Sequence, residues 1–215
     1  MFTVFTVDGR IWEERVESRP NRFMVRMESG NTCHLHDPGR LKELIYPGNR
    51  VLVRETKGAK TSCSVLAGWD SEWVIIDSRF HPAIAKRFLP PDAKGEVRAG
   101  ESRLDFHFDD TWVEVKGCSL VRNGIALFPD APTKRGEKHL RELIRLRQEG
   151  HGSMLMVLVM RPATCFLPNE ETDPRFSEAF WEAMDSGVNL VVKSFKLEGR
   201  DIVYVSDLGL CQTRK

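Results

Sequence analysis

The chain has 215 residues, a hydrophobic share of 41% and a formal net charge of +1, with a sequence pI near 7.7. This length suits one large domain or two small ones, and the apolar content is enough to build a core without external staples. A charge this close to zero is not the signature of a dedicated nucleic-acid binder, so any nucleic acid must contact a local cluster of Lys and Arg.

Residues 2–77 are predicted to form almost only β-structure. Turn signals such as Asp8-Gly9 and Pro47-Gly48 separate short segments of strand character. We expect six strands, at residues 2–7, 11–16, 22–28, 51–55, 63–68 and 73–77. Their close spacing indicates a small barrel, and the OB-fold is a barrel of this kind that binds oligonucleotides on a strand face. We assign residues 1–80 to this all-β, OB-like, DNA-binding domain.

One predicted strand of the barrel carries two arginines on a common face. Arg22 and Arg26 stand four residues apart with Met24 between them. The opposite face takes Phe23, Val25 and Met27. An arginine-bearing outer face is the expected place for contact with a nucleic-acid backbone or for base stacking. An ordinary charged barrel exterior is the open alternative, because four acidic residues lie nearby, at Glu13, Glu14, Glu17 and Glu28.

A polar segment follows in the same domain. His34 and His36 share a strand face, but the segment lacks a third ligand at a defined spacing, so we discount a zinc site. Residues 37–40 predict a turn, and a short helix is expected to run from residue 40 to residue 44. Arg40 is a candidate phosphate contact at the start of that helix.

After Asp77 the composition shifts toward an α/β pattern, and we assign residues 81–215 to a second domain. A short helix is expected near residues 83–88, and Pro90-Pro91-Asp92 is the best linker candidate. Asn123-Gly124 is the strongest short hairpin signal in the chain. We further expect helices at 134–149 and 173–184 and strands at 154–160, 190–197 and 202–205. Helices packed on a mixed sheet form an α/β domain of this type.

The candidate catalytic residues lie on a hairpin of this second domain. Strands at 103–108 and 111–116 flank an Asp109-Asp110 turn. This register places Asp105 directly across from Glu114, and both share a face with Lys116. The other face is predicted to hold Leu104, Phe106, Phe108, Val113 and Val115.

Two carboxylates opposed in this way repel each other, at a cost of up to about 1 kcal/mol. A divalent cation offsets the repulsion, and Mg²⁺ is commonly held by one or two carboxylates, waters and phosphate oxygens. We therefore predict that Asp105 and Glu114 bind Mg²⁺ or Mn²⁺ and that Lys116 completes a site for phosphodiester hydrolysis. Glu96 or Glu101 could supply a third carboxylate, and spacing does not choose between them. The alternative is a solvated hairpin face with exposed ion pairs.

The helix predicted at residues 134–149 carries a basic stripe. Its four members recur at i, i+4, i+7 and i+11, and they are Lys134, Lys138, Arg141 and Arg145. Such a stripe is wide enough to meet a phosphate backbone, and binding of that kind weakens steeply with salt. The alternative is an ordinary solvated helix, because acidic residues neighbour the stripe at Glu137, Glu142 and Glu149.

Sequence features also bear on the compartment. No run approaches the roughly 18 apolar residues that a membrane span needs, and residues 1–10 lack the basic start of a signal peptide. The five cysteines are scattered singly and form no Cys-x-x-Cys pair, which argues against a disulfide framework and a structural zinc site. We therefore expect reduced thiols in a soluble cytoplasmic protein that does not contact a membrane.

Several longer motifs are distributed over both domains. In the second domain they are Ser102-Arg103-Leu104-Asp105-Phe106, Val113-Glu114-Val115-Lys116-Gly117, Ala126-Leu127-Phe128-Pro129-Asp130-Ala131-Pro132-Thr133, Arg135-Gly136 and His139-Leu140. In the first domain they are His34, Gly39-Arg40-Leu41 and Pro47-Gly48. Together they resemble the SfsA family, the sugar fermentation stimulation proteins. The resemblance implies an OB-like barrel that binds DNA and a domain of the PD-(D/E)xK nuclease fold. Asp105, Glu114 and Lys116 match the nuclease motif, with Leu104 where its name places proline.

Together these features predict a DNA-binding protein with a nuclease-like site that depends on a divalent metal. Whether the site cleaves phosphodiester bonds stays open. One alternative is a non-cleaving DNA-binding regulator that retains the nuclease scaffold, which the family's name favours. Another is a structural or interaction protein in which the acidic pair is only the wet face of a hairpin.

Overall fold

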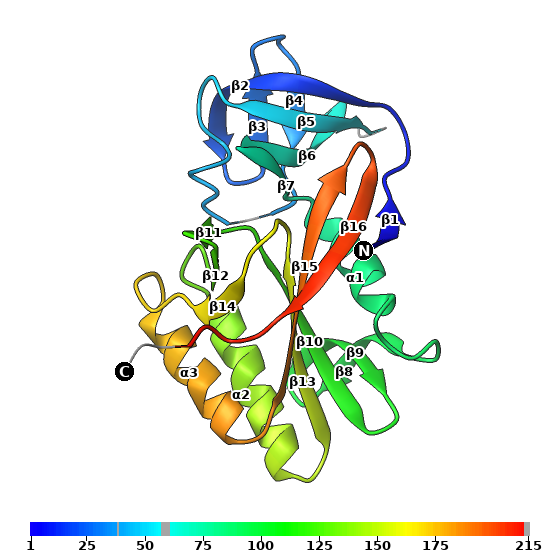
Figure 1. Ribbon diagram of the computed structural model, residues 1–215, viewed down its shortest axis with the longest axis vertical. Coiled ribbons are helices and arrows are strands. Elements are labelled where there is room, and N and C mark those ends of the chain that lie inside the picture. The colour runs from blue at the N-terminus through cyan, green and yellow to red at the C-terminus, as the bar shows by residue number, and fades with distance from the viewer. Residues whose placement is uncertain (38, 57–60, 213–215) are drawn as a thin grey trace.

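The computed structural model describes residues 1–37, 39–56 and 61–212, and it places a β-barrel above an α/β domain along the long axis (Figure 1). Five strands form the barrel: β2 (Ile11–Asn21), β3 (Met24–Met27), β4 (Thr32–His34), β5 (Arg50–Glu55) and β6 (Cys63–Asp70). They run in the order β4-β3-β2-β5-β6, and a parallel pairing of β4 with β6 closes the ring. Strand β7 (Glu72–Ile75) extends antiparallel from β6. Alternate residues such as Val25, Met27, Val51 and Val53 are fully buried and fill the barrel.

The structure corrects several predictions for the first domain. Strand β1 (Phe2–Thr6) pairs with a strand of the second domain, so the barrel begins at β2. Phe23 precedes β3 and is 41% exposed instead of facing inward, because the strand starts one residue after it. Residues 42–46 form turns and bends, not the helix expected at residues 40–44. The turn predicted at residues 37–40 includes Pro38, which lies outside the described residues.

The second domain is built on a seven-stranded mixed sheet in the order β1-β16-β15-β13-β10-β9-β8. Its further strands are β8 (Lys94–Ala99), β9 (Ser102–Phe108), β10 (Thr111–Cys118), β13 (Gly152–Val159), β15 (Asn189–Glu198) and β16 (Asp201–Leu208). The three central strands β10, β13 and β15 are parallel, and the flanking pairs are antiparallel. Residues 90–92 join two elements of this domain and do not link the two domains.

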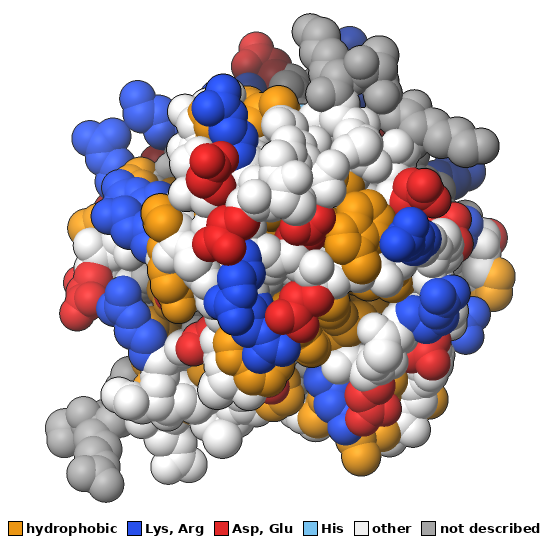
Figure 2. All heavy atoms as spheres, turned by 90° about the horizontal axis from the view of Figure 1, so that it is seen from above, with side chains coloured by type: hydrophobic (Ala, Val, Ile, Leu, Met, Phe, Trp, Pro, Cys, Tyr) orange, Lys and Arg blue, Asp and Glu red, His pale blue; other side chains and the backbone are white. Residues whose placement is uncertain are grey.

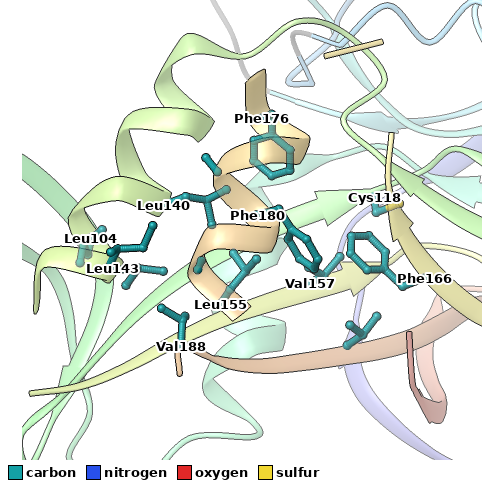
Figure 3. Packing of buried hydrophobic residues seen from close by; sticks show 14 of the residues in the cluster. Leu104, Cys118, Leu140, Leu143, Leu155, Val157, Phe166, Phe176, Phe180 and Val188 are labelled. Carbon is teal, nitrogen blue, oxygen red and sulfur yellow. The ribbon is translucent and has the colours of Figure 1, made fainter. Parts of the chain in front are cut away.

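Two helices connect the parallel strands and cover one face of the sheet (Figure 1). Helix α2 (Lys134–Gln148) lies between β10 and β13, and α3 (Pro174–Asp185) lies between β13 and β15. Thr133 and Asp173 cap these helices by accepting backbone N–H bonds from Gly136 and Phe176. The helices bury their apolar faces against the sheet in a cluster shown in Figure 3, which includes Leu104, Leu140, Leu143, Leu155, Val157, Phe176 and Phe180.

The opposite face of the sheet packs against α1 (His81–Lys86), which follows a 3₁₀ turn, η1 (Ser78–Phe80). The same apolar cluster contains Leu66, Ala67 and Ile75 of the barrel side, so one core spans both domains. Arg161 reinforces this contact, since its guanidinium is buried and binds Asp70 at 2.6 Å and Glu72 at 3.1 Å. The two domains are therefore packed in one fixed arrangement.

A small third sheet lies beside the α/β domain. It joins β11 (Val121–Arg122), β12 (Ile125–Phe128) and β14 (Cys165–Pro168). Asn123 and Gly124 turn the chain with φ of 51° and 78°, values that this residue pair adopts readily, so the predicted hairpin is confirmed. The structure also contains two strands that the sequence did not predict, β8 and β14. Strand β4 ends at His34, so the expectation that His34 and His36 share a strand face is wrong.

The expectation of reduced thiols is wrong for four of the five cysteines. Cys33 and Cys63 lie opposite each other on the paired strands β4 and β6 and form a disulfide, with Cα atoms 4.5 Å apart. A second disulfide joins Cys165 to Cys211 with Cα atoms 4.9 Å apart. Cys118 is free and buried. Partners 30 and 46 residues apart leave no local spacing signal, so only the pairing of the strands reveals them. Among the described residues, no helix combines the length and the apolar character needed to cross a membrane.

Candidate functional site

The hairpin of β9 and β10 forms in the predicted register as far as residue 106. Thr111 pairs with Phe108, and Val113 pairs with Phe106. The predicted next step, Asp105 directly across from Glu114, is not formed as a backbone pair. Instead, the backbone N–H of Val115 donates to Oδ2 of Asp105 at 2.7 Å. The Asp105 carboxylate thus accepts the Val115 N–H in place of the backbone carbonyl that a regular neighbouring strand would offer.

A kink in β9 explains this exchange. Leu104 packs in the cluster beneath α2, whereas Phe106 packs in the cluster on the α1 side. Residues two apart on a regular strand share a face, so the strand changes face at Asp105. The neighbouring Glu96 on β8 has a φ of 54°, which marks the same irregular point. The prediction that Leu104 shares a face with Phe106 is therefore wrong. At the kink, the side chain of Asp105 lies against the backbone of β10, where it reaches the N–H of Val115.

Glu114 lies at the centre of the site and is only 2% exposed. Its Oε1 atom accepts hydrogen bonds from Nζ of Lys116 and from Nδ1 of His139 on α2. An ionised carboxylate oxygen only accepts, so Nδ1 of His139 donates its proton to Glu114, while Nε of Arg135 lies 3.4 Å from Nε2 of the same ring. Helix α2 thus reaches across to orient the central carboxylate.

The second oxygen of Glu114 has no partner. Oε2 is buried and accepts no hydrogen bond from any residue that the structure describes. Leaving a buried carboxylate oxygen unsatisfied costs on the order of 1–3 kcal/mol or more. Such a group in a native structure calls for a ligand, and a cation is the ligand that an anionic oxygen takes most favourably.

The pKa values of the two carboxyl groups are shifted in opposite directions, because their partners differ. Burial, and then the Glu114 charge, raise the pKa of Asp105 to about 6, although the Val115 N–H and the Lys116 charge act against them. Burial also acts to raise the pKa of Glu114, but the His139 hydrogen bond and the Lys116 charge outweigh it and hold that pKa below its ordinary value. Near pH 7 both acids are therefore ionised. Because the cluster holds two carboxylates and only one ammonium, that of Lys116, its net charge is negative.

These residues fit a hard divalent cation. Two ionised carboxylates with an unsatisfied buried oxygen are the donor set that Mg²⁺ and Mn²⁺ take, with waters or phosphate oxygens completing the shell. Within residues 1–37, 39–56 and 61–212, no three His, Cys, Asp or Glu side chains group closely enough to hold a metal by themselves. The site thus matches a metal with two protein ligands and several exchangeable positions.

Neither predicted third carboxylate lies at the site. The side chain of Glu96 is 75% exposed and pairs with Arg103. The side chain of Glu101 is 92% exposed and lies 3.8 Å from Lys138. Sequence reasoning instead missed His139, the group that does complete the cluster. Two signals pointed to it without giving its role, the His139-Leu140 motif of the family resemblance and its position on the buried face of α2.

The predicted basic stripe on α2 is largely neutralised. Lys138 pairs with Glu101, and Arg141 pairs with Glu137 and Glu182. Arg145 pairs with Glu142 and Glu149. Lys134 is exposed and has no ion-pair partner among the residues described. These pairs favour the alternative of a solvated helix for most of the stripe.

The barrel arginines are distributed over its surface. Arg22 and Arg40 are exposed and line one shallow depression together with Arg19 and Lys42. Arg26 is also exposed but lies outside that depression. Figure 2, which looks onto the barrel end of the molecule, shows basic side chains interspersed with acidic ones. The structure therefore brings Arg22 and Arg40 together and leaves Arg26 apart.

Comparison with known proteins gives the family. A model described as the SfsA N-terminal OB domain matches residues 18–76, and one described as the sugar fermentation stimulation protein RE domain matches residues 77–201. The chain belongs to the SfsA family. Two relatives are both named sugar fermentation stimulation protein homolog. The one from Sulfurisphaera tokodaii is 57% identical over 94% of this chain and 91% of its own length. The one from Sulfolobus acidocaldarius is 54% identical over 98% of this chain and 94% of its own length.

A solved structure of this SfsA family is also similar. It is described as Pyrococcus furiosus SfsA in complex with Ca²⁺, and it matches with a TM-score of 0.88 at 28% identity, over 98% of this chain and 100% of that one. The family match and the structure confirm the predicted fold class, an OB-like barrel followed by a mixed-sheet α/β domain.

Proposed function

We propose that this SfsA protein binds DNA and cleaves its phosphodiester bonds with a divalent metal, Mg²⁺ or Mn²⁺, held by Asp105 and Glu114. The observation that carries the proposal is the buried, unpartnered Oε2 of Glu114 beside the ionised Asp105. A cation satisfies this oxygen and the net negative charge together. The description of the Pyrococcus furiosus relative as a Ca²⁺ complex supports it, because Ca²⁺ prefers the same oxygen ligands.

Each residue of the cluster has a role in this proposal. When bound, the cation lowers the pKa of a coordinated water and polarises the scissile phosphate. Lys116 Nζ, held beside Glu114, orients the attacking water and stabilises negative charge that develops on the phosphate. His139 is a positioning residue, since it holds the Glu114 carboxylate from behind and keeps it ionised. The Val115 N–H fixes Asp105 in the same way.

Cleavage is tested with the purified full chain and labelled single- and double-stranded DNA, incubated with Mg²⁺, Mn²⁺ or EDTA. We expect nicking with either metal, none with EDTA, and a loss of at least about a hundredfold in Lys116→Ala and Asp105→Ala. The control is Lys86→Ala, because Lys86 is exposed at the end of α1 and is not one of the candidate DNA contacts. Equal nicking by wild type and Lys116→Ala would show a contaminating nuclease and contradict the proposal.

A second candidate function is a DNA-binding regulator that does not cleave. One observation favours it: the described chain offers two carboxylates but no third side-chain ligand to the metal. Retention of DNA with no nicking under either metal, while divalent cations still raise the melting temperature, supports this candidate. A failure to retain DNA under any condition contradicts both candidates.

A further inference from the structure

A cavity of about 340 Å³ lies between the barrel and the α/β domain, next to the candidate site. The barrel contributes Arg22, Asp37 and Gly39 to its wall. The α/β side contributes two segments, one beginning at Gly117 directly after Lys116 and the other ending at Thr133, which caps α2. The wall of the cavity therefore begins one residue after Lys116, on the strand that also carries Glu114.

The wall of the cavity has one apolar side and two acidic groups. Leu127, Phe128 and Pro132 form part of the apolar side. Oδ1 of Asp37 accepts from the N–H of Gly39 at 2.8 Å, and Oδ2 of Asp130 accepts from the N–H of Leu41 at 3.1 Å. Each carboxylate keeps a second oxygen for which the described residues provide no recorded hydrogen bond.

This lining distinguishes between the parts of a nucleotide. The carboxylates of Asp37 and Asp130 repel a phosphate placed beside them, whereas Arg22 in the same wall attracts one, so the backbone is favoured at Arg22 and disfavoured beside the two acids. Carboxylates accept hydrogen bonds from the amino groups on base edges, such as N4 of cytosine, and apolar walls pack against base faces. The chemistry of the cavity thus suits a nucleobase, and its volume falls within the range of small-ligand pockets.

A second and independent feature lies on the barrel surface. The ring of Phe23 is parallel to that of His34, with an interplanar angle of 3° and centroids 6.3 Å apart. The ring of His36 lies 4.2 Å from that of His34, and the guanidinium of Arg22 lies 4.8 Å above Phe23. Phe23 is exposed and the two imidazoles are half-buried, so the row offers the edge of a ring platform with an arginine beside it, a combination on which bases of a single strand stack.

The row and the cavity are connected. Arg22 stacks on Phe23 and also lines the cavity. Ser78 lines the cavity and donates its hydroxyl to the carbonyl of His36 at 2.8 Å. A strand whose bases lie along the row therefore reaches the cavity without leaving the protein surface.

We infer that this protein takes single-stranded nucleic acid, with bases stacked on Phe23 and His34 and one unpaired base inserted in the cavity between the domains. A paired base presents neither its faces nor its Watson–Crick edge, so a duplex gains neither contact. The inference rests on the proposed function for what happens at the neighbouring site, and it adds the form of substrate that the site receives.

The test measures binding of nucleic acid to the full chain by fluorescence anisotropy. EDTA is present, so that metal-dependent cleavage does not occur during the measurement. The probes are a labelled single strand of mixed sequence, the same strand annealed to its complement, and oligomers of dC and of dT. We expect the single strand to bind at least about tenfold more tightly than the duplex, and dC more tightly than dT, since thymine presents O4 where cytosine presents an amino group.

Two variants assign this preference to the proposed contacts. Phe23→Ala is expected to weaken single-strand binding about tenfold and leave duplex binding unchanged. Asp130→Asn, which retains an acceptor for Leu41, is expected to remove the preference for dC over dT. Trp181→Ala is the control, because Trp181 is an equally exposed aromatic residue, 39% accessible, on α3 away from the row. Circular dichroism confirms that each variant is folded.

The outcomes separate the inference from the proposed function. Equal affinity for single strand and duplex, or no effect of Phe23→Ala, overturns the inference even if metal-dependent nicking is observed. A single-strand preference that Phe23→Ala removes, with no nicking under any metal, supports the inference and contradicts the proposed cleavage.

Discussion

At the scale of single residues, the site is defined by how three charges share a buried space. His139 and Lys116 keep the pKa of Glu114 low, so Glu114 stays ionised. Burial and the Glu114 charge raise the pKa of Asp105 instead. The sequence predicted Asp105, Glu114 and Lys116 because strand alternation and a short turn bring them together. It did not predict His139, because contact between a helix residue and a strand residue 25 positions away depends on packing that alternation does not describe.

Asp105→Asn is expected to stabilise the metal-free protein at pH 7.5. The pKa of Asp105 is raised to about 6 from its ordinary 3.8, so the folded state favours its protonated form. The stability contributed by protonation is fully present below about pH 4 and lost as the pH rises through 6. Asparagine keeps the acceptor for Val115 and removes the charge, so the free energy of unfolding at pH 7.5 should rise by about 2 kcal/mol.

Urea unfolding in EDTA at pH 7.5 and at pH 4 measures this difference, which should shrink toward zero at the lower pH. Asp92→Asn, at an exposed position, is the matched control. A variant less stable than wild type at pH 7.5 would contradict this account. Mn²⁺ should raise the melting temperature of the wild type but not of Asp105→Asn.

Removal of His139 is expected to weaken metal binding without removing a ligand. His139→Ala deletes the hydrogen bond that holds down the pKa of Glu114, so protons compete more strongly for that carboxylate. Loss of such a supporting contact typically costs 10–100-fold in metal affinity. Calorimetric titration with Mn²⁺ from pH 5.5 to 8 should show the largest loss at the acidic end. A loss that is uniform with pH would indicate a purely structural role.

At the scale of elements, β10 carries the site because it is covered on both faces. Helix α2 supplies His139 to one face, and the ring of His81 at the start of α1 packs at Gly117. The sequence predicted this strand and both helices. Strand β8 was missed because it is an edge strand whose side chains are mostly exposed, so it shows no alternating pattern.

Gly117→Ala is expected to disturb the contact between β10 and α1. A Cβ at this position would lie 2.0 Å from Cε1 of His81, so the imidazole must move. We expect a loss of about 1–3 kcal/mol in the free energy of unfolding. Gly209→Ala is the control, because a Cβ there meets no atom within 4 Å. Urea denaturation compares the two, and an equal effect would show that His81 accommodates the methyl group.

At the scale of the whole molecule, the two domains are joined more closely than a linear division of the chain suggests. Strand β1 pairs with β16 at the other end of the sequence, and one apolar cluster crosses the domain boundary. The composition shift near Asp77 predicted two domains. It did not predict that β1 joins the sheet of the second domain. A short alternating strand fits the edge of either sheet equally well, and only the long-range pairing with β16 determines which sheet it joins.

The two disulfides are the last whole-molecule feature that the sequence concealed, and counting thiols tests them directly. Cys33–Cys63 and Cys165–Cys211 close chain segments with partners 30 and 46 residues apart. Constraint of the unfolded chain by loops of this size contributes roughly 3–4 kcal/mol each. Protein denatured without reductant should therefore react with one equivalent of thiol reagent, at Cys118, and with five after reduction.

The double variants Cys33→Ser/Cys63→Ser and Cys165→Ser/Cys211→Ser should each unfold at a lower urea concentration than the wild type. Reductant should destabilise the wild type but not a variant that lacks both pairs. Five reactive thiols before reduction would show that the bonds do not form.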